Sequence, residues 1–308
     1  MPIDHILRLG LNCNFDCPFC NVLDFIKLPE RTLQDLKSEI DKLVGSKLVL
    51  SLSGGEPLLY PILDDVIKYA KLKGFRVRLQ TNASLINENR ASELKKTGLD
   101  NAFINLPSHL PETYAELTST DPKMFHRAIK GINYLTDAGI STVLNKVVTQ
   151  KNFTHLSDYL IFVKEKCPKA REVNFSIIQP HGRAFINSHL VPDYRELREP
   201  MIGAVRTANE LGIKLLNPYC GLPLCMVWGS LHPSENSEYL AGIEVRRGGK
   251  IPAPLSRVLN AKQATKSCSS CFLKNFCLGV WKKYYGIRGD VVEPPYRVLR
   301  YWPKSKVS

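Results

Sequence analysis

The chain has 308 residues, of which 44% are apolar, 9% aromatic and 23% charged, a composition that supports one or two folded domains and excludes disordered and fibrous classes. Its formal net charge of +13 would attract acidic peptides or nucleic acid, but Lys and Arg are scattered in small groups, as on solvated surfaces. No apolar run reaches the roughly 18 residues of a membrane-spanning helix, and the first residues do not form a signal peptide. We therefore predict a soluble cytoplasmic protein without a membrane partner.

Over residues 1–215, the predicted first domain, short β-rich runs alternate with longer helical patterns, which is typical of βα units and a parallel sheet. Thr32 is placed to cap the first helix, and Gly74, Gly98 and Gly139 are placed to end later ones. The expected strands are 6–11, 47–53, 75–80, 101–106, 140–149 and 172–179, and the expected helices are 32–44, 61–73, 87–97, 123–138, 154–166 and 193–211. Six units are too few for a closed eight-fold barrel. We predict an α/β fold, a partial (β/α)6 TIM-type barrel with its chemistry at the carboxyl ends of the strands.

The remaining segment, 216–308, is predicted to be a small separate domain. It is loop-rich, with many Pro and Gly residues, and it contains five of the nine cysteines. A segment with so little helical periodicity usually needs something other than a core to hold it, and bound metal is the obvious candidate. Closely spaced cysteines in a chain without an export signal favour metal or redox chemistry over disulfides.

Three cysteines follow the first predicted strand in a loop with the spacing C-x3-C-x2-C: Cys13, Cys17 and Cys20. A structural zinc site needs four protein ligands, and no fourth Cys or His follows nearby. An iron–sulfur cluster held by three thiolates would instead leave one iron open for a substrate or cofactor. The spacing therefore favours such a cluster over the alternatives, a zinc knuckle or three free thiols.

A Gly-Gly-Glu turn, Gly54, Gly55 and Glu56, stands at the end of the second predicted strand. Glycines let the backbone approach a ligand closely, and a carboxylate can accept a hydrogen bond from an ammonium group. Alone, the turn is weak evidence, because it is also an ordinary loop sequence. Neither G-x-G-x-x-G after a strand nor G-x4-G-K-[ST] is present, which disfavours Rossmann dehydrogenases and P-loop enzymes.

Taken together, the cysteine loop and the Gly-Gly-Glu turn resemble the radical S-adenosylmethionine (SAM) superfamily, whose cysteine loop follows the first strand of a partial (β/α)6 barrel. The resemblance implies a 4Fe-4S cluster on the three early cysteines, with the open iron binding SAM. It also implies that the turn contacts the SAM amino group and that Phe19 packs near the adenine.

The same resemblance implies weaker contacts from later strand ends. Polar residues there can reach the SAM ribose or carboxylate, or can serve as turn residues and caps; they are Thr81, Asn82, Ser108 and Asn145. Arg183 lies in a stretch similar to the family's Pro-x-Gly-Arg-Ala turn, beside the adenine or substrate. Its guanidinium would clamp a carboxylate or lie in solvent.

The late cysteines form a second pattern, in which Cys268, Cys271 and Cys277 follow Cys220 and Cys225. Such thiols chelate either zinc or an iron–sulfur cluster. The region resembles the SPASM or twitch extension of radical SAM enzymes, which implies an auxiliary 4Fe-4S cluster. A tryptophan stands where the full SPASM pattern has a further cysteine, so five thiols suit one cluster better than two. One thiol is then spare, and we single out Cys225 and Cys277 as hydrogen-atom or proton donors, against the alternative of an inert buried thiol.

The resemblance implies an enzyme that reductively cleaves SAM to a 5′-deoxyadenosyl radical, which abstracts a hydrogen atom from the substrate. Enzymes with this extension act mostly on peptides, so the first hypothesis is a peptide maturase that makes a crosslink, an epimerised centre or an oxidised side chain. Only twelve residues precede the first cysteine, so we expect the barrel, the C-terminal segment or a separate recognition protein to bind a leader peptide. An electron donor such as flavodoxin or ferredoxin is also expected.

Two alternatives stay open. One is a radical SAM dehydrogenase or mutase that acts on a small precursor such as a sugar, an aminocyclitol or a nucleoside. The other is a zinc-stabilised RNA-binding protein that uses its basic surface, although nucleic acid is disfavoured as a partner. A colourless protein that binds zinc and does not cleave SAM would indicate the latter.

Overall fold

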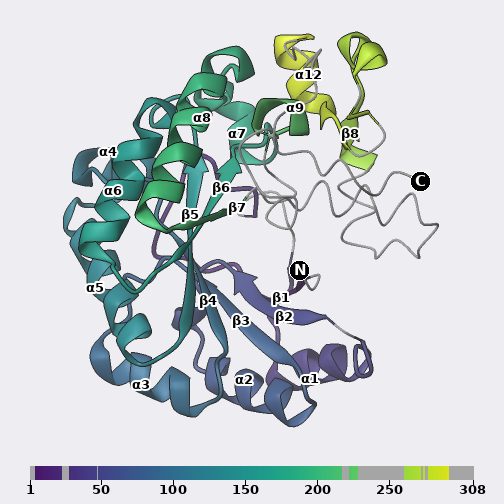
Figure 1. The fold of residues 1–308 in the computed structure, drawn as a ribbon. Helices are drawn as coiled ribbons and strands as arrows, with labels where there is room; N and C mark the ends of the chain where they lie inside the picture. The colour runs from purple at the N-terminus through teal and green to yellow at the C-terminus, as the bar shows by residue number, and fades with distance from the viewer. Residues whose placement is uncertain are drawn as a thin grey trace, which may run out of the picture.

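The computed structural model describes residues 4–22, 28–46, 48–216, 222–227, 260–271, 273–274 and 277–290. Seven parallel strands form one sheet in sequence order, with β1 and β7 at its two edges (Figure 1). The strands are β1 (Asp4–Gly10), β2 (Val49–Gly54), β3 (Arg76–Thr81), β4 (Asn101–Asn105), β5 (Ser141–Val148), β6 (Glu172–Ile177) and β7 (Lys214–Leu216). The sheet curves like a barrel that is not closed, so the predicted partial barrel is confirmed.

Helices cover the outer face of the curved sheet (Figure 1). They are α1 (Leu33–Asp41), α2 (Leu63–Leu72), α3 (Glu88–Lys96), α4 (Pro111–Thr118), α5 (Lys123–Asp137), α6 (Leu156–Lys166) and α8 (Tyr194–Leu211). Their apolar stripes bury residues such as Leu36, Val66 and Ile132 against strand residues such as Leu50 and Val77. This interface is the core, and it fixes the positions of the strand ends.

Local signals set the helix ends as the sequence predicts. Thr32 Oγ1 accepts a hydrogen bond from Asp35 N at 3.2 Å, and Asp35 Oδ2 accepts one from Thr32 N at 2.9 Å, which is a complete capping box. Gly74, Gly98 and Gly139 follow α2, α3 and α5 with φ of +83°, +95° and +73°. Such left-handed backbone ends a helix and favours glycine.

The six predicted strands are confirmed with boundaries that differ by at most two residues, but several shorter elements were not predicted. The seventh strand, β7, has only three residues, which is too short to show an alternating pattern. Helix α4 and the late helix α12 (Lys282–Arg288) were also missed. These additions extend the predicted barrel without changing its class.

The late part of the chain that the structure describes packs on the barrel. It contains α9 (Leu224–Val227), the antiparallel pair β8 (Lys262–Gln263) and β9 (Val280–Trp281), and α12. The rings of Tyr194 and Tyr284 stack with centroids 3.8 Å apart and an interplanar angle of 15°. Tyr284 Oη accepts a hydrogen bond from Tyr194 N at 2.8 Å. Most of 216–308 lies outside the described residues, so the predicted domain boundary stays a prediction.

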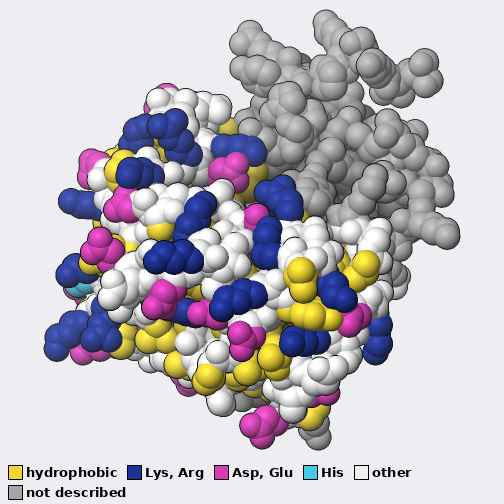
Figure 2. Space-filling model, turned by 90° about the horizontal axis from the view of Figure 1, so that it is seen from below, with side chains coloured by type: hydrophobic (Ala, Val, Ile, Leu, Met, Phe, Trp, Pro, Cys, Tyr) yellow, Lys and Arg dark blue, Asp and Glu magenta, His cyan; other side chains and the backbone are white. Residues whose placement is uncertain are grey.

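Charges are mixed on the face that Figure 2 shows, where Lys and Arg side chains alternate with Asp and Glu. Charged side chains also form ion pairs on the surface, such as Lys73 with Asp41 and Lys169 with Asp137. None of the helices in the described ranges combines the length and apolar character needed to cross a membrane.

Candidate active site

The three early cysteines lie on the loop that leaves β1. Cys13 Sγ accepts a hydrogen bond from Phe15 N, and Cys20 Sγ accepts one from Val22 N, both at 3.5 Å. Burial raises the pKa of the Cys13 and Cys17 thiols, with the larger effect on Cys17. Such thiols bind a metal only when they lose their protons, and the backbone N–H groups then stabilise the sulfur charge.

The Gly-Gly-Glu turn at the end of β2 is held against the end of β1. Gly55 N donates to Gly10 O at 2.9 Å, and Glu56 N donates to Asn12 O at 2.8 Å. A Cβ on Gly54 would lie 2.1 Å from Gly10 O, and a Cβ on Gly55 would lie 2.0 Å from Asn12 O. Both positions therefore require glycine, because no side chain fits between the two segments. The motif brings the end of β2 to the start of the cysteine loop.

The Glu56 carboxylate is buried between the ends of β2 and β3, with only 1% of the residue exposed. It accepts hydrogen bonds from Thr81 Oγ1 at 2.8 Å, Asn82 N at 2.9 Å and Leu58 N at 3.2 Å. Leu58 belongs to the short 3-10 helix η1 (Pro57–Leu59). Burial raises the pKa of Glu56 to about 7, although the three hydrogen bonds oppose this shift. A cationic group beside the carboxylate would favour its ionised form.

Asn82 links the Gly-Gly-Glu region to the cysteine loop. Its Nδ2 donates to Asn14 Oδ1 at 2.9 Å, and its Oδ1 accepts from Ser84 Oγ at 2.7 Å. Asn14 Nδ2 in turn donates to Ser84 Oγ at 2.9 Å. This ring of three side chains fixes the cysteine loop against the end of β3.

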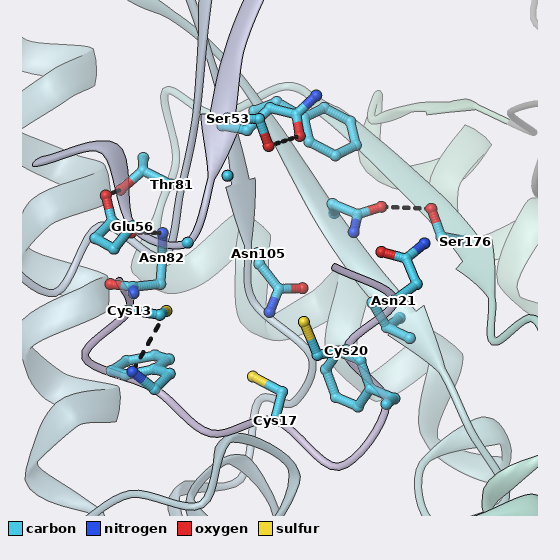
Figure 3. Close-up of a pocket in the computed structure, with 18 of the residues that line it drawn as sticks. Cys13, Cys17, Cys20, Asn21, Ser53, Glu56, Thr81, Asn82, Asn105 and Ser176 are labelled. Carbon is cyan, nitrogen blue, oxygen red and sulfur yellow. Dashed lines mark hydrogen bonds between the residues drawn. The ribbon is translucent and has the colours of Figure 1, made fainter. Parts of the chain in front are cut away.

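These groups line one cavity of about 290 Å³ at the carboxyl ends of the strands, and Figure 3 shows Cys17 and Cys20 facing it. The described lining consists of Cys13, Phe15, Cys17, Phe19, Cys20, Asn21, Ser53, Gly54, Gly55, Glu56, Gln80, Thr81, Asn82, Phe103, Asn105, Asn145, Val147, Ser176, Ile177, Ile178 and Gln179. The predicted cysteine loop, the Gly-Gly-Glu turn and four further predicted residues therefore meet in one place; those four are Phe19, Thr81, Asn82 and Asn145.

The inner part of the cavity is polar. Asn145 Oδ1 accepts hydrogen bonds from Asn174 Nδ2 at 2.6 Å and from Ser176 Oγ at 2.7 Å. Ser53 Oγ donates to Gln80 Oε1 at 2.8 Å. In closed (β/α)8 barrels, inward-facing positions are mostly filled by branched apolar side chains. Here amides and hydroxyls take several of these positions, beside the apolar Phe103 and Val147, and leave room for a ligand that forms hydrogen bonds.

Asn105, at the end of β4, is a cavity residue that the sequence analysis missed. Its side chain points into the cavity on the side of Cys17 and Cys20 (Figure 3). Its Oδ1 is buried and has no hydrogen-bond partner among the described residues. Because an unsatisfied buried acceptor costs about 1–3 kcal/mol, this atom is well suited to accept a hydrogen bond from a ligand. The alternation that turns Phe103 inward also turns Asn105 inward, and this was the available sequence signal.

Two of the predicted cofactor residues are not part of the cavity lining. Ser108 lies beyond β4, where its Oγ accepts a hydrogen bond from Leu110 N at 3.0 Å. Arg183 begins the short helix α7 (Arg183–Ile186), and its guanidinium forms an ion pair with the Asp16 carboxylate on the cysteine loop.

Four of the late cysteines lie in the same region of the structure, while Cys220 lies outside the described residues. Burial raises the pKa of the Cys225 thiol, and the charges of its neighbours Cys277, Cys271 and Cys268 raise it further. The structure therefore groups Cys225 with the C-x2-C-x5-C cysteines.

A backbone N–H group and a hydroxyl group contact two of these thiols. Gly279 N donates to Cys277 Sγ at 3.3 Å, and Thr265 Oγ1 lies 3.4 Å from Cys268 Sγ. In the part of the chain that the structure describes, no three His, Cys, Asp or Glu side chains are close enough to share a single metal ion. The assignment of cluster ligands at both cysteine groups stays a prediction.

Comparison with protein families gives a match to the model of the radical SAM superfamily over residues 7–155. This range contains the cysteine loop, the Gly-Gly-Glu turn and the strand ends up to β5.

Two curated relatives are each 28% identical to this chain. An AdoMet-dependent heme synthase of Methanosarcina barkeri aligns over 335 residues, which covers 95% of both chains. A probable GTP 3′,8-cyclase of Saccharolobus islandicus aligns over 263 residues, which covers 82% of both.

Solved structures show the same fold at lower identity. The structure of anSMEcpe with bound AdoMet and Kp18Cys peptide superposes with a TM-score of 0.63 at 12% identity, covering 96% of this chain and 94% of that one. Streptococcus suis SuiB superposes with a TM-score of 0.55 at 18% identity, covering 70% of this chain. The match spans only about half of SuiB, 48% of its length.

The sheet is open and parallel, and its first loop carries three cysteines. Together with the family match, these features define an iron–sulfur enzyme. Residues 7–155 form a radical SAM domain, and the chain is an iron–sulfur enzyme. This class implies SAM and a 4Fe-4S cluster as cofactors.

Proposed function

We propose that Cys13, Cys17 and Cys20 hold the 4Fe-4S cluster and that the cavity beside them binds SAM. The chemistry of the donors supports this, because three thiols face one cavity and two of them accept backbone N–H groups. When bound, the two cofactors supply a one-electron cleavage that yields a 5′-deoxyadenosyl radical and removes a hydrogen atom from the substrate. The protein's part is to position these groups and exclude water.

The residues of the cavity divide this work. Glu56 accepts the SAM ammonium group beside Gly54 and Gly55, where the backbone approaches closely. Its carboxylate is held by the end of β3, as described above, so its orientation is fixed before SAM binds. The other residues proposed to contact SAM are Phe19, Thr81, Asn82, Asn105 and Asn145. Ser108 and Arg183 are proposed to act through the loops that they hold.

We propose a peptide as the substrate, modified by a crosslink, an epimerisation or an oxidation. The observation that carries this is the part of the cavity lining that is not assigned to SAM, because it contains the amides Asn21, Gln80 and Gln179 and no described Lys, Arg or His. Such a lining suits a neutral ligand with many hydrogen-bonding groups, such as a peptide backbone. The full-length similarity to a fold solved with a bound peptide agrees with this.

A small-molecule substrate is the second candidate, since both curated relatives carry names of small-molecule enzymes. A nucleoside triphosphate would need cationic partners for its phosphates, and the described lining offers none. Where a short peptide gene lies beside this one, incubation with its product should give a peptide that has lost two hydrogens or inverted one centre. Turnover of GTP or a haem precursor, with the peptide unchanged, would establish the second candidate instead.

We further propose that Cys225, Cys268, Cys271 and Cys277 hold one auxiliary 4Fe-4S cluster, and that Cys220 is the spare thiol. The electrostatic influence of the other three thiols on Cys225 and the polar groups near two of the thiols support this assignment. Cys225 and Cys277, singled out from the sequence as spare donors, thereby become ligands. The electron that cleaves SAM comes from a flavodoxin or ferredoxin, and a separate protein binds the leader of the peptide.

Replacing a single early cysteine tests the first of these assignments. After anaerobic reconstitution with iron and sulfide, the parent protein should form 5′-deoxyadenosine from SAM and dithionite, as measured by liquid chromatography. Cys17→Ala should form none, because it removes one of only three protein ligands. Cys167→Ala, the same change at a buried thiol in the hydrophobic core, is the control and should retain activity. Equal rates for the parent and Cys17→Ala would refute the assignment.

The binding of SAM should also depend on pH through Glu56. Because burial raises the pKa of this carboxylate to about 7, its protonated fraction grows as the pH falls below 7, and a protonated carboxyl attracts no ammonium group. Affinity for SAM, measured by equilibrium dialysis, should therefore weaken about tenfold per pH unit below 7. Glu56→Gln should bind weakly with a flat profile. An equal pH dependence in the Gln variant would contradict the role given to Glu56.

A further inference from the structure

A segment that follows β6, residues 182–187, lies directly against the cysteine loop, and we call it the brace. Arg183 N donates to Cys20 O at 2.9 Å, and Asn187 Nδ2 donates to Pro18 O at 3.0 Å. The Arg183 side chain reaches further along the loop, to the carboxylate of Asp16. The brace therefore contacts the loop between and beside its second and third cysteines.

The fit between brace and loop is close at Gly182. This residue has φ of +61°, and a Cβ on it would lie 2.6 Å from Asn21 Cα and 2.7 Å from Cys20 O. Only glycine lets the two backbones approach this far. Backbone atoms of the segment after β6 therefore contact the loop, in addition to its side chains.

The ion pair also sets the charge beside the loop. Asp16 precedes Cys17 in the chain, and its side chain is 71% exposed, whereas that of Arg183 is only 18% exposed. An uncompensated carboxylate at this position would place a negative charge next to the thiolates. Reduction of an iron–sulfur cluster adds one more negative charge, so a nearby anion disfavours it, and a paired cation removes most of that effect.

We propose that Arg183 is a positioning residue that braces the cysteine loop and neutralises Asp16, so that the cluster on this loop is easier to reduce. The inference rests on the proposed cluster at Cys13, Cys17 and Cys20. It assigns Arg183 a role toward the loop in place of a clamp on SAM or substrate. The rest of the brace supports the loop without contributing a charge, because Asn187 holds the loop through its hydrogen bond to Pro18 O.

A redox titration of the reconstituted protein, followed by visible absorption and electron paramagnetic resonance, tests this proposal. Arg183→Ala should lower the reduced-to-oxidised ratio at a fixed potential about tenfold, which is 59 mV for a one-electron couple. Adding Asp16→Asn to Arg183→Ala should restore the parent ratio, because the double variant no longer has the carboxylate that lost its partner. Arg183→Lys keeps the charge and should stay near the parent.

Two matched controls separate charge from support. Asn187→Ala should leave the ratio unchanged but release iron faster to a chelator, because it removes only the hydrogen bond to Pro18. Lys169→Ala breaks a similar ion pair with Asp137 just before β6, at the opposite end of that strand from the brace, and should change neither property. If Arg183→Ala does not retain iron, the single variant Asp16→Asn tests the proposal in its place. Its reduced-to-oxidised ratio should lie above that of the parent.

An unchanged ratio in Arg183→Ala, or no restoration by Asp16→Asn, would overturn the proposal. Failure of the underlying cluster assignment is recognised separately. In that case Cys17→Ala would have the same iron content and the same visible absorption as the parent, whatever Arg183 does.

Discussion

Gly55→Ala should abolish SAM cleavage and detach the end of β2 from the cysteine loop. The new methyl carbon would lie 2.0 Å from Asn12 O and 2.4 Å from Asn12 C, both backbone atoms that cannot rotate away. To relieve the clash, the turn must move, and the hydrogen bonds from Gly55 N and Glu56 N to the end of β1 are then lost. Losing these bonds costs about 0.5–1.5 kcal/mol each. Displacement of Glu56 removes the group proposed to accept the SAM ammonium.

The experiment measures 5′-deoxyadenosine formation together with thermal unfolding of the variant. Gly203→Ala makes the same chemical change inside α8, where the nearest atom to a new Cβ is Ser157 Oγ at 3.7 Å. That control should keep its activity and gain up to about 1 kcal/mol in the free energy of unfolding, because alanine favours a helix. Activity in Gly55→Ala at the level of Gly203→Ala would show that the close backbone contact is not required.

Lys146→Met should stabilise the protein near neutral pH. The ammonium group of Lys146 is fully buried, its Nζ donates only to Pro107 O at 3.2 Å among the contacts given by the structure, and it lies 4.6 Å from the ring centroid of Tyr159. Burial lowers the pKa of Lys146 from 10.5 to about 7. Methionine fills a similar volume without the charge, and Pro107 O keeps its hydrogen bond from Asn152 Nδ2 at 2.8 Å.

The sign of the pH dependence follows from proton binding. Between pH 7 and 10.5 the unfolded chain keeps the Lys146 proton while the folded protein releases it. Stability of the parent should therefore rise with pH in this window, by about 1.4 kcal/mol per pH unit. Lys146→Met should lack this contribution and be more stable than the parent by several kcal/mol, roughly 5 at most, at pH 7 and below. Urea unfolding at several pH values measures the free energy of unfolding of the parent and of Lys146→Met. The control is Lys96→Met, the same change at an exposed lysine of α3. Identical pH profiles for the parent and Lys146→Met would refute the prediction.

The barrel was predictable because its strands and helices carry strong local signals. Thr32 and the glycines after α2, α3 and α5 mark helix ends through their own backbone preferences. Strand β7 gives no such signal, because three residues define no period and its place beside β6 depends on the register of Glu172 with Lys214. Helix α4 does begin with Pro111 at its first position and Glu112 in its first turn, so its signal was present and overlooked.

The site was predictable where one short motif carries the chemistry, and not where distant residues meet. Cys13 and Glu56 lie in recognisable motifs, and both face the cavity. The partner of Arg183 is Asp16, 167 positions away in the sequence, and no local pattern indicates such a pair. The unpartnered oxygen of Asn105 is likewise a property of the folded cavity alone.

The tyrosine stack between α8 and α12 links the segment after the brace to the segment after Cys277. Tyr194 stands seven positions after the brace residue Asn187, while its partner Tyr284 follows Cys277 by the same interval. A metal that orders the late cysteines would therefore stiffen the segment that presses on the early loop.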